Sequence, residues 1–244
     1  MRRLLPLSFL ALSLSAQIHE IKSMAEVASF ADADTVIFFD LDKTVFDGVG
    51  PHCTADWIYQ QTAGAQKTGM PIKEAAILLR PYWEAQQSHC QVKAIEAITA
   101  AEIRKLQNKG LTVMALTARS TLSLESTLKQ LKSVNVDFSK TAWPKVEIVE
   151  PTFEKSNFQH GVFLSGDRPK GELFGSYFKL NLVKQMPKTI ILVDDLKTNL
   201  ESMQAVAQAQ NIKFIGLYYP LIDKRSKRPA KRAPSKAPGV AQSA

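Results

Sequence analysis

Apolar runs alternate with helical patterns along the middle of the chain. Residues 36–39 form a continuous apolar run, and two others occupy 111–116 and 189–193. Short uninterrupted runs of this kind are typical of strands buried on both faces of a parallel sheet. Strands that alternate with helices favour an α/β fold with right-handed crossovers. A further run at 212–219 is expected to form the last strand.

The segments between these runs predict helices and one insertion. Ser23 and Glu26 have the spacing of a capping box, which predicts a short helix before the first run. After a turn at 47–51 the pattern is helical up to Gly110, a residue suited to end a helix. A βαβ crossover needs only a dozen or more residues, so we expect residues 53–91 to form an inserted helical cap. Further helices are predicted over 92–109, 120–132 and 197–210.

The remaining patterns are less regular. Residues 141–163 show no clear period, and 145–149 and 158–164 are short strand candidates. Within 92–109, four apolar residues recur at helical spacing and are predicted to face the core. They are Ile95, Ile98, Ile103 and Leu106.

Polar residues follow three of the apolar runs where each run ends. Asp40 and Asp42 follow the first, Thr117 the second, and Asp194 and Asp195 the third. Ligands bind at the carboxyl ends of strands in open α/β sheets. Two aspartates spaced i, i+2 repel each other there, so a cation or a shared proton is expected to relieve them. The first segment alone fits an Asp-rich turn equally well, but the ordered trio favours a site.

This trio resembles the signature of the haloacid dehalogenase (HAD) superfamily, mostly magnesium-dependent phosphohydrolases. Residues 40–44 match its first motif, Thr117 its second, and Asp194 with Asp195 its fourth. The resemblance covers roughly residues 35–220. It implies a Rossmann-like parallel sheet with helices on both faces and a small helical cap after the first strand. The chain is also similar to an uncharacterised family of exported bacterial HAD-like proteins.

The third motif of the superfamily is one lysine between the second and fourth motifs. Lys170 fits best, because it follows an apolar stretch and opens a helical pattern. Lys179 and Lys184 are weaker candidates, and for Lys170 itself an ordinary surface lysine is the alternative. Lys43 departs from the glycine or aspartate common at its position in the first motif, without consequence for the implied mechanism.

The resemblance implies a role for each motif residue. Asp40 would be the nucleophile and form an aspartyl-phosphate. Asp42 would protonate the leaving group and later activate water. Thr117 would hydrogen-bond a phosphoryl oxygen, and Lys170 would cancel charge on that oxygen and on Asp40. Arg119, two residues past Thr117, is either a substrate contact or part of a surface salt bridge.

The implied cofactor is Mg²⁺, which prefers oxygen ligands. Its protein ligands would be Asp40, the main-chain carbonyl of Asp42, and Asp194, with Asp195 acting through water. For Asp195 an N-cap of the following helix is an alternative role, and both roles are compatible.

The first hypothesis for function is an exported, magnesium-dependent phosphomonoesterase acting on small phosphorylated metabolites such as nucleotides or sugar phosphates. Asp42 supports it by the resemblance, because dehalogenases and phosphonate hydrolases lack an acid there and transport ATPases carry threonine. Phosphomutases keep the acid, but they serve metabolism inside cells. A second hypothesis is a catalytically weak protein of this fold that binds envelope or host partners through its C-terminal tail. A protein phosphatase, the third, would have a smaller cap.

The N-terminus has the form of a secretory signal peptide at residues 1–16. Arg2 and Arg3 precede an apolar stretch at 4–14, and small residues follow. That stretch is too short for the roughly 20 residues of a membrane-spanning helix. A helix docked on the core is the alternative. We expect a mature bacterial protein, periplasmic or secreted, without a transmembrane span and folded over 17–223.

Residues 224–244 carry much of the formal net charge of +8. The segment has seven basic residues and no acidic or aromatic ones, a composition that predicts disorder. Without this tail and the signal segment the chain is close to neutral, so no specific nucleic-acid binding is expected. The tail either contacts an anionic surface or keeps the protein soluble.

The two cysteines, Cys53 and Cys90, fall at the two ends of the predicted cap. In an oxidising compartment they would form a disulfide, and two buried thiols are an equal alternative. His52 and His89 beside them permit a metal site, although the usual Cys-x-x-Cys spacing is missing.

Overall fold

A computed structural model describes residues 17–141, 148–149, 157–166, 168–179 and 187–226. The predicted signal peptide at 1–16 lies outside these residues. The same is true of 227–244, which is nearly all of the predicted tail, and of Lys184. No helix in the part of the chain that the structure describes is both long and apolar enough to cross a membrane.

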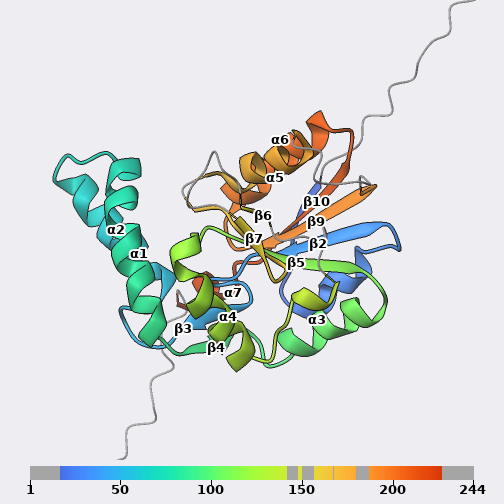
Figure 1. Ribbon diagram of the computed structural model, residues 1–244, viewed down its shortest axis with the longest axis horizontal. Coiled ribbons are helices and arrows are strands. Elements are labelled where there is room, and N and C mark those ends of the chain that lie inside the picture. Colours follow the sequence, from blue (N-terminus) through green and yellow to red (C-terminus); the bar gives the residue numbers. More distant parts are fainter. Residues whose placement is uncertain (1–16, 142–147, 150–156, 167, 180–186, 227–244) are drawn as a thin grey trace, which may run out of the picture.

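An eight-stranded sheet forms the middle layer of the molecule (Figure 1). In chain order its strands are β1 (Gln17–Glu20), β2 (Thr35–Phe39), β5 (Thr112–Thr117), β6 (Ile148–Val149), β7 (Asn157–Gln159), β8 (Val162–Leu164), β9 (Thr189–Asp194) and β10 (Lys213–Tyr218). Their order across the sheet is β1-β10-β9-β2-β5-β8-β7-β6. The first six in that order are parallel to one another, and the pairings of β8 with β7 and of β7 with β6 are antiparallel. The predicted α/β fold with a mainly parallel sheet is confirmed.

Two pairs of helices cover the two faces of the sheet (Figure 1). They are α3 (Thr99–Asn108) with α4 (Leu124–Ser133), and α5 (Lys170–Lys179) with α6 (Lys197–Ala209). In β2, Ile37 and Phe39 belong to the core on the α3 and α4 side, whereas Val36 and Phe38 belong to the other core. Because β2 is covered on both faces, an unbroken apolar run is the pattern that it needs.

The central position of β2 sets the location of the site. Phe39, its last residue, pairs with Val193 of β9 on one side and with Ala115 of β5 on the other. The amide of Asp40 then donates to the Val193 carbonyl at 2.9 Å. The residues that follow β2, β5 and β9 therefore share one edge of the sheet.

A pair of helices projects from this edge (Figure 1, left). They are α1 (Ala55–Lys67) and α2 (Ile72–Gln86), followed by the 3-10 turn η2 (Gln87–His89). The pair, called the cap below, lies between strands β3 (Phe46–Gly48) and β4 (Val92–Ala94), which pair antiparallel.

The root of the cap is closed covalently. Cys53 and Cys90 form a disulfide, so the alternatives of two buried thiols and of a site with thiolate ligands are wrong. Gly48 makes this root possible, because a Cβ there would lie 2.1 Å from the carbonyl oxygen of Cys53.

The segment 92–109 differs from the predicted helix. Its first residues form β4, and α3 begins only at Thr99. Ile98 precedes the helix and is 39% exposed, so its predicted core contact is wrong. Ile95, Ile103 and Leu106 are buried as expected. The helical spacing was therefore partly coincidental, because pairing with β3 draws the start of the segment into a strand.

The strand candidate at 158–164 is two strands. β7 and β8 form a hairpin that turns at His160 and Gly161, both with positive φ. Residues 120–132 likewise begin as the 3-10 turn η3 (Thr121–Ser123) before α4, and η4 (Ser139–Thr141) follows α4.

Both ends of the described chain add elements to the fold. β1 extends the sheet beside β10, and the 3-10 helix η1 (Met24–Ser29) follows with the predicted capping box of Ser23 and Glu26. At the other end, α7 (Leu221–Ser226) runs three residues past the predicted start of the tail.

Candidate active site

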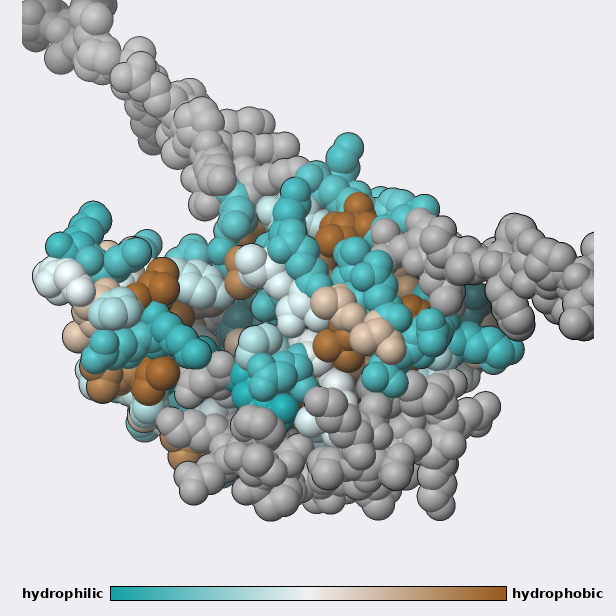
Figure 2. Space-filling model, turned by 90° about the horizontal axis from the view of Figure 1, so that it is seen from above, coloured by the Kyte–Doolittle hydropathy of each residue, from teal (hydrophilic) through white to brown (hydrophobic). Residues whose placement is uncertain are grey.

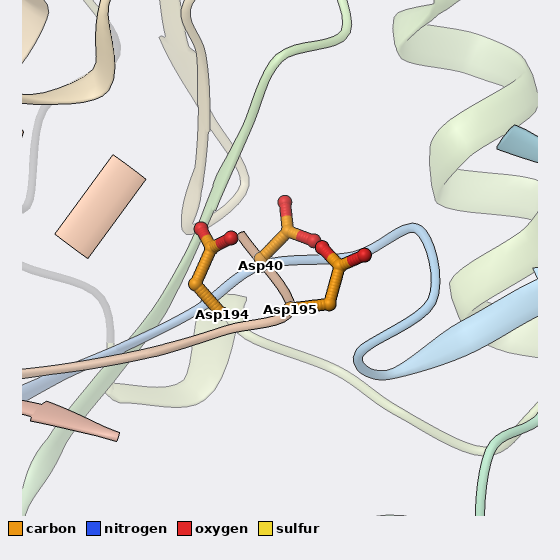
Figure 3. A group of neighbouring side chains, drawn as sticks. All are labelled: Asp40, Asp194 and Asp195. Atoms are coloured by element: carbon orange, nitrogen blue, oxygen red, sulfur yellow. The ribbon is translucent and has the colours of Figure 1, made fainter. Parts of the chain in front are cut away.

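Three buried carboxylates lie together at the carboxyl edge of the sheet (Figure 3). Asp40 follows β2, Asp194 ends β9 and Asp195 comes next, and one oxygen from each lies within 4.8 Å of the others. The strand register brings these residues together as expected from the ends of the apolar runs.

Lys170, the first residue of α5, reaches into this cluster. Its Nζ donates to Oδ1 of Asp40 at 2.5 Å and to Oδ2 of Asp194 at 2.6 Å. Burial lowers the pKa of the Lys170 ammonium, but the two carboxylates raise it above its ordinary value. Lys170 is 1% exposed, so the alternative of a surface lysine is wrong. Lys179 lies at the opposite end of α5.

Close packing of two helices aims Lys170 at the site. A Cβ on Gly171 would lie 2.1 Å from the Ser202 carbonyl oxygen of α6. The amide of Gly171 also donates to the Ser202 hydroxyl at 3.2 Å. Only a residue without a side chain permits this approach at the start of α5.

Asp194 holds the start of the segment that leads into α6. Its Oδ1 accepts from the amide of Leu196 at 2.9 Å and from Nδ2 of Asn199 at 3.0 Å. The N-cap position of α6 is occupied by Leu196, so the N-cap role considered for Asp195 is wrong. Asn199 escaped the sequence analysis, because no motif distinguishes it from other polar residues of this helix.

Asp195 gives the clearest indication that this cluster suits a cation. Its Oδ2 is buried and accepts no hydrogen bond from any described residue, and Lys43 Nζ is 3.8 Å away. Burial, with the neighbouring carboxylates of Asp40 and Asp194, raises its pKa to about 9. Burial also raises the pKa of Asp40 to about 7, against the opposing effect of Lys170. A cluster of carboxylate oxygens with one orphaned acceptor fits a divalent cation such as Mg²⁺.

The Asp42 carboxylate is bound by Arg119 and not by Lys170. Arg119 donates from Nε to Oδ2 of Asp42 at 2.8 Å and from a terminal nitrogen to Oδ1 at 2.7 Å. The same guanidinium donates to Thr127 at 3.1 Å and to Gln130 at 2.6 Å. Arg119 is 1% exposed, so this is a buried, bidentate ion pair, and of the two alternatives for Arg119 the surface salt bridge is wrong. The Asp42 carboxylate is not part of the three-carboxylate cluster.

The loop after β5 connects Arg119 to the cap. Arg80 of α2 donates to the Ala118 carbonyl at 2.5 Å. Glu84, buried on the same helix, accepts from the amide of Ser120 at 2.7 Å and from its hydroxyl. α2 is thus fixed to the residues on both sides of Arg119. These partners are far apart in sequence, so no local sequence pattern predicts the contacts between them.

Thr117 ends β5 beside the cluster. It is 1% exposed, and its Oγ1 accepts from the amide of Arg119 at 3.3 Å. With that acceptor role filled, its hydroxyl proton is directed elsewhere, and Thr117 lines the same cleft as Asp40 and Asp42.

Lys43 was given no role by the sequence, but it links three elements. Its backbone has φ of +66°, a conformation that glycine adopts without strain. Its buried Nζ donates to Asp56 of α1 at 2.9 Å and to Asp223 of α7. Burial lowers the pKa of Lys43, but these carboxylates raise it above its ordinary value. The loop after β2, the cap and the C-terminal helix are therefore joined at one cation.

A cleft of about 360 Å³ opens between the carboxylates and the cap. Tyr59 of α1 lines this cleft together with Asp40 and Asp195. The ring of Tyr59 lies 5.9 Å from Lys43 Nζ. Helical spacing predicts a helix here but not which of its residues face the site, so Tyr59 was missed.

Fold and site together define an α/β protein with a buried carboxylate and lysine site at the edge of a parallel sheet. A family model described as "Protein of unknown function (DUF2608)" matches residues 15–238, and the chain belongs to this family. It is 29% identical over 210 residues to a "Putative outer membrane protein" of Chlamydia trachomatis, covering 84% of this chain and 77% of that protein. A protein of the same description from Chlamydia muridarum is 27% identical over 208 residues, with 84% and 77% covered.

Two solved structures are similar at low identity. The class C acid phosphatase from Bacillus anthracis with tungstate bound is 18% identical, with a TM-score of 0.37 and coverage of 86% of this chain and 79% of that one. A phospho-aspartyl intermediate analogue of phosphoserine phosphatase is 14% identical, with a TM-score of 0.35 and coverage of 78% and 90%.

Proposed function

We propose that the protein is a divalent-metal-dependent phosphomonoesterase of the HAD type with Asp40 as nucleophile. One observation carries this proposal. The sheet edge gathers Lys170 and the carboxylates of Asp40, Asp194 and Asp195 into one buried cluster, with Thr117 lining the same cleft. These are the residue types that phosphoryl transfer requires, since the protein must position a nucleophile and cancel charge on the phosphoryl oxygens.

In the first half of the reaction, an Asp40 oxygen attacks phosphorus. A bond forms between that oxygen and phosphorus, and the bond from phosphorus to the leaving oxygen breaks. Lys170 fixes the Asp40 carboxylate through Oδ1 and opposes its charge. The Thr117 hydroxyl donates to a phosphoryl oxygen. Mg²⁺, held by Asp40, Asp194 and the main-chain carbonyl of Asp42, with Asp195 through water, would supply positive charge against the phosphoryl group.

In the second half, water attacks phosphorus and releases phosphate and the free Asp40 carboxylate. Asp42 takes the proton of that water, a role that suits an ionised carboxylate. Its other implied role, protonating the leaving oxygen, is harder to perform from the observed position. Proton donation requires Asp42 to start protonated, which would weaken its ion pair with Arg119.

We infer that the protein acts outside the cytoplasm. The disulfide of Cys53 and Cys90 supports this inference, because disulfides persist in oxidising compartments. The predicted signal peptide at 1–16 agrees with it, as do the names of the chlamydial relatives.

Phosphate release by the mature chain, residues 17–244, tests the enzymatic proposal. The panel is phenyl phosphate, glycerol 3-phosphate, glucose 6-phosphate and AMP, each with Mg²⁺ or with a chelator. We expect metal-dependent turnover of at least one ester and a loss of roughly 10³-fold or more in Asp40→Asn. Asp34→Asn, an exposed carboxylate, is the matched control and should keep full activity.

A second readout addresses the intermediate. Acid quenching during turnover should trap phosphate on the wild-type chain and none on Asp40→Asn. Turnover that persists in Asp40→Asn or with the chelator would contradict the proposal. An absence of turnover with every metal and ester would favour the binding role instead.

A further inference from the structure

The cleft has two chemically different sides. Its base is polar and carries Asp40, Asp42, Asp195 and Thr117. The cap side and the adjoining start of α6 are mostly apolar, with Figure 2 showing brown, hydrophobic surface on the cap lobe at the left. The apolar lining residues are Ala55, Ile58, Ile72, Ala76, Trp83 and Leu196.

Two polar side chains on the cap side are already engaged within the protein. The Thr62 hydroxyl donates to the Ile58 carbonyl at 2.7 Å, and Arg80 donates to the Ala118 carbonyl. Lys73 lies at the exposed rim, and Tyr59 is the other polar side chain of this wall. A sugar placed against the wall would bury most of its hydroxyl groups without partners, which is unfavourable. An apolar group would gain from the same contact.

The size of the cleft limits what it holds. Ligand pockets typically measure about 300–1,000 Å³, and this one is about 360 Å³. An apolar cavity of about 150 Å³ binds benzene. The cleft therefore has room for one phosphoryl group and one ring-sized apolar group.

The position of Asp42 favours a leaving group that departs without full protonation. Asp42 forms a bidentate ion pair with Arg119, whose guanidinium is held further by Gln130, and protonation of Asp42 would weaken this pair. A phenolic oxygen, as in tyrosine, is acidic at about pH 10, whereas water loses its proton only near 15.7. An aromatic ester thus needs less help from Asp42 than an alkyl or sugar ester does.

We propose that the substrates are phosphate monoesters of small aromatic alcohols, with the ring between Ile58, Ile72 and Trp83 and the phosphoryl group at Asp40. This inference rests on the proposed function and names its substrate class. The bond from phosphorus to the aryl oxygen breaks with its electron pair leaving on that oxygen, which takes a proton from water. The bond from Asp40 to phosphorus forms in its place and is then hydrolysed.

The first test compares kcat/KM for three esters at one Mg²⁺ concentration. Phenyl phosphate should exceed cyclohexyl phosphate, which isolates the leaving-group effect. Cyclohexyl phosphate should exceed glucose 6-phosphate, which isolates apolar burial, and the whole range should reach at least about 100-fold. Equal or greater activity on glucose 6-phosphate or AMP would overturn the inference while leaving the phosphatase proposal intact.

Binding decides the inference even without turnover. Phenylphosphonate, which cannot be hydrolysed at its carbon–phosphorus bond, should bind the Mg²⁺-loaded protein at least about tenfold more tightly than methylphosphonate by calorimetry. Equal affinities would overturn the inference. If phenylphosphonate binds more tightly but no ester is hydrolysed, the aromatic site stands and the phosphatase proposal fails.

Matched variants locate the preference in the cap. Ile58→Asn should lower kcat/KM for phenyl phosphate about tenfold and leave that for glucose 6-phosphate nearly unchanged. Leu78→Asn changes an exposed cap residue that does not line the cleft, and it should alter neither value. Equal losses on both esters in Ile58→Asn, with a normal melting temperature, would contradict the assignment of the ring to this wall.

Discussion

The sheet edge and the cap place their side chains in opposite environments. At the edge, charged groups such as Asp40, Lys170 and Asp194 are buried and bound to one another. On the cap, large apolar side chains face outward or into the cleft. Five of the eight exposed large hydrophobic residues in the described chain belong to it: Tyr59, Ile72, Ile77, Leu78 and Tyr82. The difference teaches that the sheet edge binds its polar groups to one another, whereas the cap leaves apolar surface open to a ligand or to solvent.

The largest effect is expected from breaking the sheet edge. Lys170→Met leaves the buried carboxylates of Asp40 and Asp194 without their shared cation. Removing one partner of a buried ion pair costs about 3–5 kcal/mol. We expect about 4 kcal/mol of lost stability in urea unfolding without metal. Lys188→Met, which breaks the exposed pair with Asp34, should cost far less, because solvent screens that pair. Equal losses of stability in the two variants would contradict the claim that the Lys170 ion pairs are buried and the Lys188 ion pair is not.

The next effect concerns the cap alone. Cys53 and Cys90 close a loop with a sequence separation of 37 residues, for which chain entropy predicts a contribution of about 4 kcal/mol. Cys53→Ser with Cys90→Ser should speed hydrogen exchange in α1 and α2. Exchange in β2 and β9 should change much less, because the core strands bury their amides independently of the cap. Uniformly faster exchange would show that cap and sheet unfold as one unit.

A smaller effect is expected where the two regions meet. Arg119→Lys keeps the charge but loses the bidentate contact with Asp42 and the bond to Gln130 or Thr127. We expect about 2 kcal/mol of lost stability by chemical denaturation. Arg104→Lys, whose guanidinium donates to the Asn135 carbonyl at the exposed surface, serves as control and should change stability by less than about 0.5 kcal/mol.

The smallest effect is a pH dependence at the hinge of the cap. Burial raises the pKa of Asp47 to about 6, with Asp42 adding to the shift and the Gly48 amide opposing it. A raised carboxyl pKa means that the folded state holds its proton more tightly than the unfolded state. The contribution of Asp47 to the free energy of unfolding is therefore most favourable below about pH 4 and is lost as pH rises through about 6.

Asp47→Asn should remove the loss of stability at higher pH, and the Asn side chain can still accept the hydrogen bond from the Gly48 amide. We expect a gain of about 1–2 kcal/mol at pH 7 and little change at pH 3.5, measured by urea unfolding at both values. A gain of the same size at both values would assign the effect to something other than titration.

The sheet edge was more predictable from sequence than the cap. Asp40, Thr117 and Asp194 come at the ends of buried strands, so their order along the chain also fixes their place in the sheet. Arg119 and Glu84 pair with residues 77 and 36 positions away. Local periodicity carries no information on such partners, and the same limit left Tyr59 unnoticed and Lys43 without an assigned role.

The errors in the fold have a related cause. Ile98 has the residue type and spacing of a core position, but it precedes the helix that would have turned it inward. Strand pairing between β3 and β4 decided where α3 begins, and that pairing joins segments separated by the whole cap. The local sequence pattern therefore predicted strands well where helices cover both faces of the sheet. It predicted the ends of elements poorly where a partner distant in sequence determines them.

The disulfide at the root of the cap also determines what a protease would produce from the protein. A single cut anywhere between Cys53 and Cys90 would yield two fragments that remain joined through their sulfur atoms. Nicked protein would run as one species on a gel without reductant and as two with it. One cleavage within the cap would therefore not release any part of it from the rest of the protein.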